Sequence, residues 1–501
     1  MADLKNAFIE WWSTIKIDVA LIKKYFYSIS IVYTIGILSI IRANYNYMDD
    51  FGRVLYGYRG WDDFSRYISY YGSVILHADG ILNDISPFPQ LLAAIIMGLA
   101  GAILIYVYSR DKSFSWIKVT AVVPLGLSPY FLECFSFKFD APYMAISVLA
   151  SVVPLLFVES NQKLNMLAVF LGTLIMCMTY QAASGIYVLS IIFLMALHWN
   201  NGLTSKQCFK KLTYSLSAYI IAMLFYRIAI MKVVDDYASS SIIGDKSIFL
   251  TIIDNIKTYF TYLRGDSTDV WLIICATLCL CFLRSFVLES CRNKTIAIVI
   301  AILLLIICSI LSYGAYIILQ KPLFYPRAMY GIGAFLSVIA LLSLQSKQVN
   351  YLSKIVCVSL AWSMIVFSLA YGNCLAEQRR YDNFRAQILI NDLSKLPNMD
   401  DKRIRKMQLQ GSIGYSPVVK RVSERYKVMN RLVHESVSSG FCFGEFYVFK
   451  YFNISGIRQV VSWGENRTTL YEKDLPVFLD TAYHTIKADD RSIIIKFKNT
   501  Q

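Results

Sequence analysis

Long apolar stretches alternate with short polar segments over the first three quarters of this 501-residue chain. An α-helix rises about 1.5 Å per residue, so about 20 mainly apolar residues are needed to cross a bilayer. Eleven stretches approach that length, near residues 25–42, 91–109, 119–133, 142–158, 166–180, 185–199, 212–231, 270–288, 296–319, 329–345 and 355–372. The pattern predicts an α-helical polytopic membrane protein with about eleven transmembrane helices, although the runs beside 180–185 could form one broken helix.

After the last apolar run the pattern changes to mixed charge with short amphipathic segments. Residues 377–393 repeat apolar positions at helical spacing, whereas the β-branched run at 491–497 is typical of a strand. We therefore expect a transmembrane domain over residues 1–372, with a large first outer loop at 43–90. A small soluble α/β domain is expected over residues 373–501.

The distribution of Lys and Arg predicts which loops face the cytoplasm, because positively charged loops are retained on that side of the membrane. The amino-terminal arm is basic, and every second loop after it also carries Lys or Arg. The intervening loops at 43–90 and 233–269 are long and rich in Asp. We expect the amino terminus to be cytoplasmic and, with an odd number of spans, the carboxy-terminal domain to lie outside.

The composition agrees with a membrane protein: 56% of the residues are hydrophobic, 17% are charged and the mean hydropathy is +0.49. The formal charge of +15 does not indicate nucleic-acid binding, because the basic residues lie in short loops and in the tail rather than in one basic, aromatic patch. The eleven cysteines include no pair at zinc-site spacing, and most lie in apolar runs as small core residues do.

Charged side chains gather at the outer ends of successive predicted helices, where a pocket facing outward would form. The first cluster follows the first span and contains Asp49, Asp50 and Arg53. Adjacent side chains point in different directions on any regular element, so only one of the two aspartates is expected to face a given substrate atom. The alternative is that one of them caps a helix that begins near Phe51.

Three further clusters lie on the same side of the predicted bundle. Lys138 and Asp140 lie in a very short turn between two spans, where a plain ion pair is the alternative to a role in binding. Gln181 lies between two apolar runs, where turn formation would also account for it. Tyr325 and Arg327 lie where another span begins, and an arginine there could simply extend toward the membrane surface.

Together these clusters offer carboxylates, cations and aromatic rings around one outward-facing cavity. The set suits attack of a sugar hydroxyl on a sugar phosphate, which needs a carboxylate base, cations for the leaving phosphate and tolerance of an oxocarbenium-like transition state. We expect Asp49 or Asp50 to be the base. Lys138 and Arg327 are expected to bind the phosphate. The residues expected to shape the sugar site are Arg53, Asp140, Gln181 and Tyr325.

Four motifs carry a resemblance that covers nearly the whole membrane part. They are NYMDDFGR at 46–53, NDISPFPQ at 83–90, FKFDAPYMAIS at 137–147 and YPR at 325–327. In them the chain resembles the bacterial and phage glucosyltransferase II family, which modifies O-antigen and looks like the C-type glycosyltransferase superfamily. The resemblance implies transfer of glucose from undecaprenyl-phosphate-glucose to the lipopolysaccharide O-antigen on the periplasmic face of the inner membrane. It also implies an essential acidic residue in the first outer loop, a role carried over to Asp49 and Asp50 only.

The resemblance also bears on partners and cofactors. Such proteins accompany a small flippase and a separate enzyme that makes the lipid-linked glucose. The superfamily contains metal-assisted and metal-free members. No local ligand spacing joins the four histidines, which are His77, His198, His434 and His484. The acidic pair Asp235 and Asp236 gives weak support to a divalent metal site, and we assign no metal ligands.

Two other functions remain open, namely a transporter or flippase and an O-antigen polymerase or ligase acting on lipid-linked sugars. The charges gather at outer helix ends rather than at mid-membrane depth, and no inverted repeat with matched broken helices is visible, which argues against transport. For a polymerase or ligase we would expect basic rather than acidic outer loops. The acidic first loop favours the glucosyltransferase.

Overall fold

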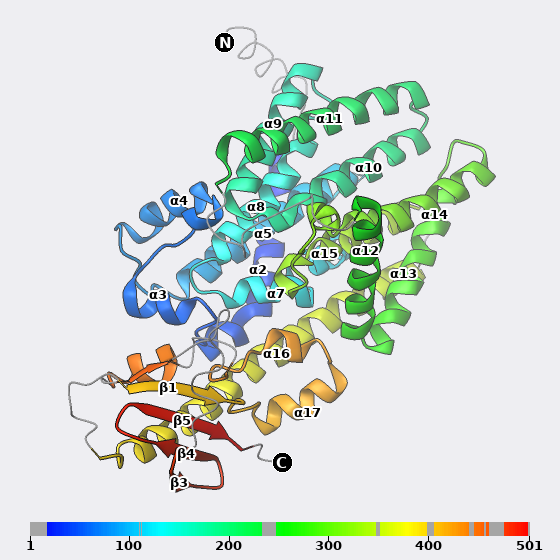
Figure 1. Cartoon of the computed structure of the whole chain (residues 1–501). Coiled ribbons are helices and arrows are strands. Elements are labelled where there is room, and N and C mark those ends of the chain that lie inside the picture. The colour runs from blue at the N-terminus through cyan, green and yellow to red at the C-terminus, as the bar shows by residue number, and fades with distance from the viewer. Residues whose placement is uncertain are drawn as a thin grey trace.

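A bundle of helices fills most of the molecule, and a small sheet lies at one end of it (Figure 1). The structure, a computed structural model, describes residues 18–109, 111, 113–232, 247–346, 351–397, 405–439, 445–454, 457–459 and 475–498. Most of the basic amino-terminal arm and the pair Asp235 and Asp236 lie outside the described residues. The metal site suggested by that acidic pair therefore stays a prediction.

The helices follow the apolar pattern of the sequence closely. In the first half of the chain they are α2 (Val19–Ala43), α3 (Asp50–Tyr56), α4 (Tyr67–His77), α5 (Phe88–Tyr108), α6 (Trp116–Leu127), α7 (Pro129–Ser136), α8 (Ala141–Val152), α9 (Gln162–Thr179), α10 (Ser184–Asn200) and α11 (Ser205–Phe225). They continue as α12 (Ile248–Asp266), α13 (Asp269–Leu288), α14 (Lys294–Leu311), α15 (Gly331–Ser343), α16 (Tyr351–Leu393), α17 (Pro417–Arg425) and α18 (Met429–Leu432).

Eight helices of the described chain are long and apolar enough to cross a membrane, namely α2, α5, α9, α10, α11, α13, α14 and α16. The helices α6 and α7 pass the same test together but meet at a bend of 61°, which gives nine crossings if the pair is one span. The apolar helices α8 and α15 are shorter. All eleven predicted stretches fall on these helices, so the polytopic helical class is confirmed, while the number eleven stays a prediction.

Three helices lie in segments that the apolar pattern left as outer loops. They are α3 and α4 in the first loop and α12 in the later acidic loop. In α12, the buried residues Thr251, Asn255 and Tyr259 recur every four positions, so one face packs on the bundle while much of the rest stays exposed. The first outer loop thus brings an ordered helix, α3, to the end of α2.

Small residues let two neighbours approach the backbone of α2 closely. A Cβ at Gly98 of α5 would lie 2.1 Å from Ser30 Oγ, and a Cβ at Gly372 of α16 would lie 2.4 Å from the backbone nitrogen of Ile40. Close packing of this kind holds helices together in a bilayer, where the hydrophobic effect does not. The contact with α16 fixes the outer end of α2, which leads directly into the candidate site.

The described part of the tail contains one five-stranded sheet in the order β2-β1-β5-β4-β3. Its strands are β1 (Arg405–Gln410), β2 (Ile457–Gln459), β3 (Val477–Asp480), β4 (His484–Ala488) and β5 (Ser492–Phe497). Strand β1 pairs in parallel with β2 and β5, whereas β5–β4 and β4–β3 are antiparallel. The strand predicted at 491–497 is confirmed as β5.

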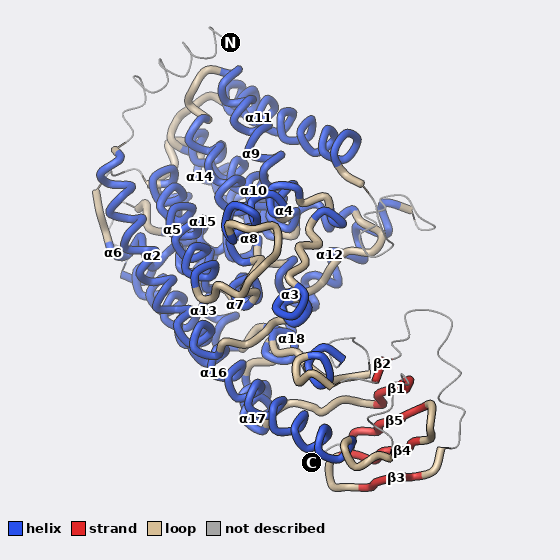
Figure 2. Tube along the Cα trace, turned by 90° about the vertical axis from the view of Figure 1, so that its left-hand side faces the viewer, coloured by secondary structure: helices blue, strands red, loops and turns tan. Residues whose placement is uncertain are grey.

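One long helix joins the bundle to this sheet. The helix α16 has 43 residues and contains the segment 377–393 that was predicted to be helical. Its outer half packs Ala386, Leu389 and Leu393 into the same core as Ile493 and Ile495 of β5. Figure 2 shows α18 next to this end of the bundle and α17 alongside the lower part of α16. The helix passes the expected domain boundary at 372/373 without a break, and that boundary stays a prediction.

Replacing Gly372 with Ala should destabilise the protein by about 1–3 kcal/mol, because the new methyl group overlaps backbone atoms of α2 that have no room to move. The free energy of unfolding in mixed detergent micelles measures the effect. Gly265→Ala in α12 is the matched control, since nothing lies within 4 Å of its Cβ position. Equal stability of the two variants would contradict the close contact.

Candidate active site

Two clusters of charged side chains, most of them buried, lie at the carboxy-terminal end of α2, where the first outer loop meets the turn after α7. We call them the Asp50 cluster (Asp50, Arg53, Asp84, Lys138 and Asp140) and the Glu133 cluster (Tyr47, Glu133, Arg327 and His434). Tyr47 connects them, because its backbone N–H donates to Asp50 Oδ2 at 3.0 Å and its hydroxyl donates to Glu133 Oε1 at 3.2 Å. The site therefore forms one polar network inside an apolar bundle.

The two adjacent aspartates have opposite environments. Asp50, the first residue of α3, is 0% exposed, whereas Asp49 is exposed and its side chain makes no capping hydrogen bond in the described structure. Only one of the two carboxylates is therefore buried, and the expectation that one of them faces a substrate atom stays a prediction. Asp50 Oδ2 also accepts from the backbone N–H of Lys138 at 3.0 Å.

The second oxygen of Asp50 is the least satisfied group of the cluster. Asp50 Oδ1 is buried and has no hydrogen-bond partner among the described residues. Burial raises the pKa of Asp50 to about 7, against the opposing effect of two backbone N–H donors and of the nearby Arg53 guanidinium. A carboxyl group with this pKa changes its charge near neutral pH, which suits a proton acceptor.

Arg53 and Asp140 form a buried ion pair that ties α3 to α8. Trp61 completes the pair: its Nε1–H donates to Asp140 Oδ1 at 2.5 Å, and the Arg53 guanidinium lies 4.5 Å from the centre of its ring. Asp140 directly precedes α8, where the positive end of the helix dipole favours a carboxylate. This contact holds α3, and with it Asp50, in place.

Lys138 pairs with residues of the first outer loop rather than with Asp140. In the described structure its Nζ lies 3.0 Å from Asp84 Oδ2 and 2.7 Å from Asn46 Oδ1. Burial acts to raise the pKa of Asp84, but hydrogen bonds from Ser86 and the charge of Lys138 outweigh it and lower that pKa. The alternative of an ion pair within the turn is therefore wrong, because both charges have closer partners on the loop.

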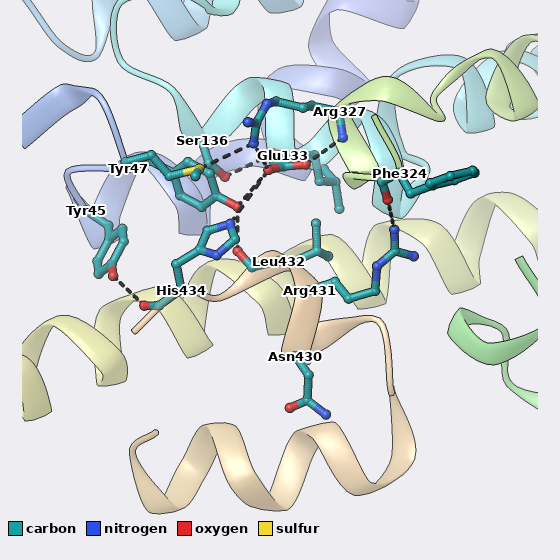
Figure 3. Close-up of polar contacts among 12 residues, drawn as sticks. Tyr45, Tyr47, Glu133, Ser136, Phe324, Arg327, Asn430, Arg431, Leu432 and His434 are labelled. Atoms are coloured by element: carbon teal, nitrogen blue, oxygen red, sulfur yellow. Dashed lines mark hydrogen bonds and ion pairs between the residues drawn. The ribbon is translucent and has the colours of Figure 1, made fainter. Parts of the chain in front are cut away.

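Glu133 is the centre of the second cluster, which Figure 3 shows. Its side chain is 0% exposed; Oε1 accepts from Arg327 Nη1 at 2.7 Å and Oε2 from the Arg327 backbone N–H at 2.5 Å. His434 Nε2 lies 3.7 Å from Oε1. Arg327 also lies 4.6 Å from the centre of the Tyr325 ring. It therefore binds a buried carboxylate instead of extending toward the membrane surface.

Gln181 belongs to a different group of contacts. It accepts from Arg66 Nε at 3.1 Å and donates to the hydroxyl of Tyr226 at 2.8 Å. Arg66 in turn lies 4.5 Å from the centre of the Tyr180 ring. No hydrogen bond between Gln181 and either cluster is present among the described residues, so its expected part in the sugar site stays a prediction.

The tail supplies residues to the site that sequence reasoning missed. His434 faces Glu133, and Arg431 forms an ion pair with Asp266 at the end of α12 (Figure 3 shows both tail residues). Burial raises the pKa of Asp266 to about 6. The hydroxyl oxygen of Tyr47 also lies 2.8 Å from the carbonyl oxygen of Leu432, so Leu432 and Glu133 share its one proton. For Glu133 a signal existed, since it is a carboxylate at the end of an apolar run. The tail residues have no such local signal.

Comparison with known proteins decides the family. The sequence model described as glucosyl transferase GtrII matches residues 38–338. The chain belongs to this glucosyltransferase family. It is also 23% identical over 444 residues to a Salmonella phage P22 protein described as an uncharacterized 55.3 kDa protein in the gtrB 5′ region, a match that covers 84% of this chain and 88% of that protein. No solved structure matches.

The family match covers the part of the candidate site that lies in the helical bundle and leaves out the part that the tail supplies. Residues 38–338 include α3, both charge clusters apart from His434, and the segment that carries Arg327. The helix α16, the sheet and the tail segment that carries Arg431 and His434 lie beyond the match. The family match indicates glucosyl transfer as the reaction class. The matched part of the chain also contains most of the charged residues of the two clusters.

The buried Arg53–Asp140 pair should stabilise the fold more than an exposed pair does. Arg53→Met or Asp140→Asn alone should cost about 3–5 kcal/mol, because each leaves an uncompensated buried group, and the double variant should lose less than the sum. The free energies of unfolding of the wild type, the two single variants and the double variant give the coupling energy between the two side chains. The matched cycle at Arg264 and Asp269, whose side chains are 65% and 87% exposed, should give about 0–1 kcal/mol. Equal couplings would refute the structural role.

Proposed function

We propose that this protein transfers glucose from undecaprenyl-phosphate-glucose to the O-antigen of lipopolysaccharide, which changes the serotype of the cell. The observation that carries the proposal is the buried Asp50 carboxyl, with its unpartnered Oδ1 and a pKa of about 7, inside a chain of the glucosyl transferase GtrII family. The donor is the one that the motifs of the membrane part imply.

The reaction is proposed to take place on the periplasmic face of the bacterial inner membrane, with about eleven spans and a cytoplasmic amino terminus. Two observations support this arrangement. The basic loops alternate with the acidic loops that contain the site. The segment at 431–436 of the tail contacts Tyr45 and Tyr47 directly, so the tail and the site share one end of the bundle. The tail is then a periplasmic α/β domain.

In the proposed mechanism Asp50 accepts the proton of the attacking acceptor hydroxyl through Oδ1, while the bond between the glucose anomeric carbon and the phosphate oxygen breaks. Arg327 and Lys138 stabilise the departing phosphate. A guanidinium has five N–H donors and an ammonium three, so their pairing with Glu133 and Asp84 is compatible with this role. Asp49 is the alternative base. Sugar recognition is assigned to Arg53, Asp140, Gln181 and Tyr325.

Cofactor and partner requirements follow from the same proposal. Among the described residues no group of three or more His, Cys, Asp and Glu side chains could hold a metal ion, so no metal ligands are assigned. A dependence on divalent metal is tested by adding a chelator to the reconstituted enzyme. A flippase and an enzyme that makes the lipid-linked glucose would supply the donor to the outer face.

Asp50→Asn should reduce glucose incorporation by about 100-fold or more, because an amide cannot accept the proton, whereas Asp49→Asn should stay close to wild type. The measurement is glucose incorporation into O-antigen in cells that make the lipid-linked donor, at matched membrane levels of each variant. Full activity of both variants would reject the acidic-pair mechanism. Absence of glucose with the wild type would favour a transporter or a polymerase.

The pKa of Asp50 sets the expected pH dependence. Below about pH 7 the carboxyl is protonated and cannot act as a base, so kcat/KM should fall about tenfold for each pH unit as the pH decreases from neutral. Initial rates of the reconstituted enzyme in buffers on both sides of pH 7 give the profile. The residual activity of Asp50→Asn should not show this decrease of kcat/KM below pH 7. A flat wild-type profile between about pH 5 and pH 8 would exclude Asp50 as the base.

A further inference from the structure

Three adjoining recesses form a groove along the outer end of the bundle. The first, of about 550 Å³, lies between α2 and α16 and is lined by Arg42, Arg379 and Arg380 among others. The second, of about 200 Å³, shares Arg379 and Asn383 with the first. The third, of about 140 Å³, shares Tyr45 and Phe51 with the second. The shared lining residues place the three recesses next to one another in this order.

The first recess lies where the apolar part of the bundle ends. Arg42 is in the last turn of α2 and donates to the side chain of Asn373, which follows the last apolar stretch of α16. Helix ends at this position are level with lipid headgroups. The recess is therefore open to an anionic group carried by a membrane lipid.

The charges of the first recess favour phosphate. Three arginines and one carboxylate, Glu377, line it. Arg380 Nη1 lies 2.6 Å from Glu377 Oε1, and Arg379 Nη1 donates to the carbonyl of Ala43 at 3.1 Å. With one carboxylate against three guanidinium groups, the recess keeps an excess of positive charge. Planar guanidinium groups match the oxygen pairs of phosphate.

The second recess has different walls, which suit a saccharide. Aromatic side chains of Tyr45, Phe51 and Tyr451 line it together with the amides of Asn46 and Gln387. Aromatic rings cover the apolar faces of sugar rings, while planar amides donate to and accept from sugar hydroxyls. Among the described residues that line this recess, Arg379 is the only one with a charged side chain.

The groove ends at the charge clusters. Met48 and His434 line the third recess. Arg327 Nη1 lies 3.3 Å from the sulfur of Met48, and His434 Nε2 lies 3.7 Å from Glu133 Oε1. Asn46 of the second recess accepts from Lys138 in the Asp50 cluster. A chain bound along the groove would thus deliver one end to the reacting groups.

We propose that this groove binds the acceptor as an oligosaccharide joined through a diphosphate to a polyprenyl lipid, with the diphosphate between Arg42 and Arg380. The inference rests on the proposed glucosyl transfer. The donor does not suit this recess, because its phosphate is bonded to the reacting carbon and must lie at the charge clusters. Arg42 and Arg380 line the first recess only, and the second recess lies between that recess and the charge clusters. The acceptor alone has sugars between its phosphate and its reacting hydroxyl.

The test compares wild type with the double variant Arg42→Gln, Arg380→Gln in the full-length reconstituted protein. Two acceptors carry the same oligosaccharide, one on polyprenyl diphosphate and one released from the lipid. We expect the KM for the lipid-linked acceptor to rise about tenfold, the loss of one hydrogen bond to a charged group, with kcat, the donor KM and the KM for the free oligosaccharide unchanged. Arg264→Gln, a change at an exposed arginine outside the groove, should alter none of these values.

A second variant tests the saccharide part of the path. Gln387→Ala, at an exposed position of the second recess, should raise the KM for both acceptors by about the same few-fold factor. An equal rise for both acceptors in the double arginine variant would overturn the phosphate assignment. A rise in the donor KM instead would show that the arginines serve the donor, which also overturns it.

A binding measurement separates this inference from the proposed reaction. The wild type and the double arginine variant are titrated with the polyprenyl-diphosphate oligosaccharide, and complex formation is followed by native mass spectrometry. About tenfold weaker binding by the variant supports the groove even if no glucose is transferred, in which case the proposed reaction fails alone. Equal binding by both proteins overturns the groove, whatever the activity.

Discussion

A charge removed from water has to meet an opposite charge or hydrogen-bond donors, and the end of the bundle next to the tail is built around that requirement. Glu133, Asp140 and Asp266 are each buried, and each is paired with an arginine from a distant part of the chain. One pair joins α7 to the segment before α15, and another joins the start of α8 to the first outer loop. The third joins α12 to the tail. The geometry of the candidate site thus follows from pairing the charges that the apolar helices carry inward.

Asp50 departs from this pattern, and the departure is chemically informative. Its Oδ2 is satisfied by two backbone N–H groups, while Oδ1 has no partner among the described residues. The surrounding pairs hold α3 against α8, so the exposed neighbour Asp49 and the buried Asp50 cannot exchange places without breaking the Arg53–Asp140 contact. An unsatisfied carboxyl is kept buried because the rest of its surroundings is rigid.

The parts of this fold that sequence predicts are those set by local pattern. Apolar runs located the helices, and a β-branched run located β5. The adjacency of Asp49 and Asp50 predicted that their side chains point in different directions, and Asp50 is buried while Asp49 is exposed. Partner choice was not accessible in this way: Lys138 lies two residues from Asp140 yet binds Asp84, because the tertiary fold brings the first outer loop closer. The contacts of Arg431 and His434 cross at least 100 residues of sequence, so no spacing rule could anticipate them.

The continuity of α16 has a mechanical consequence. A helix of 43 residues is about 65 Å long, roughly twice the thickness of a bilayer core. Because one end packs on α2 and the other on the sheet, a rigid helix rather than a flexible linker connects the tail to the bundle. The distance of the tail from the bundle and its rotation about the axis of α16 are fixed when the chain folds. Arg431 and His434 therefore reach the bundle pre-positioned, without the loss of entropy that docking a freely tumbling domain would incur on every encounter.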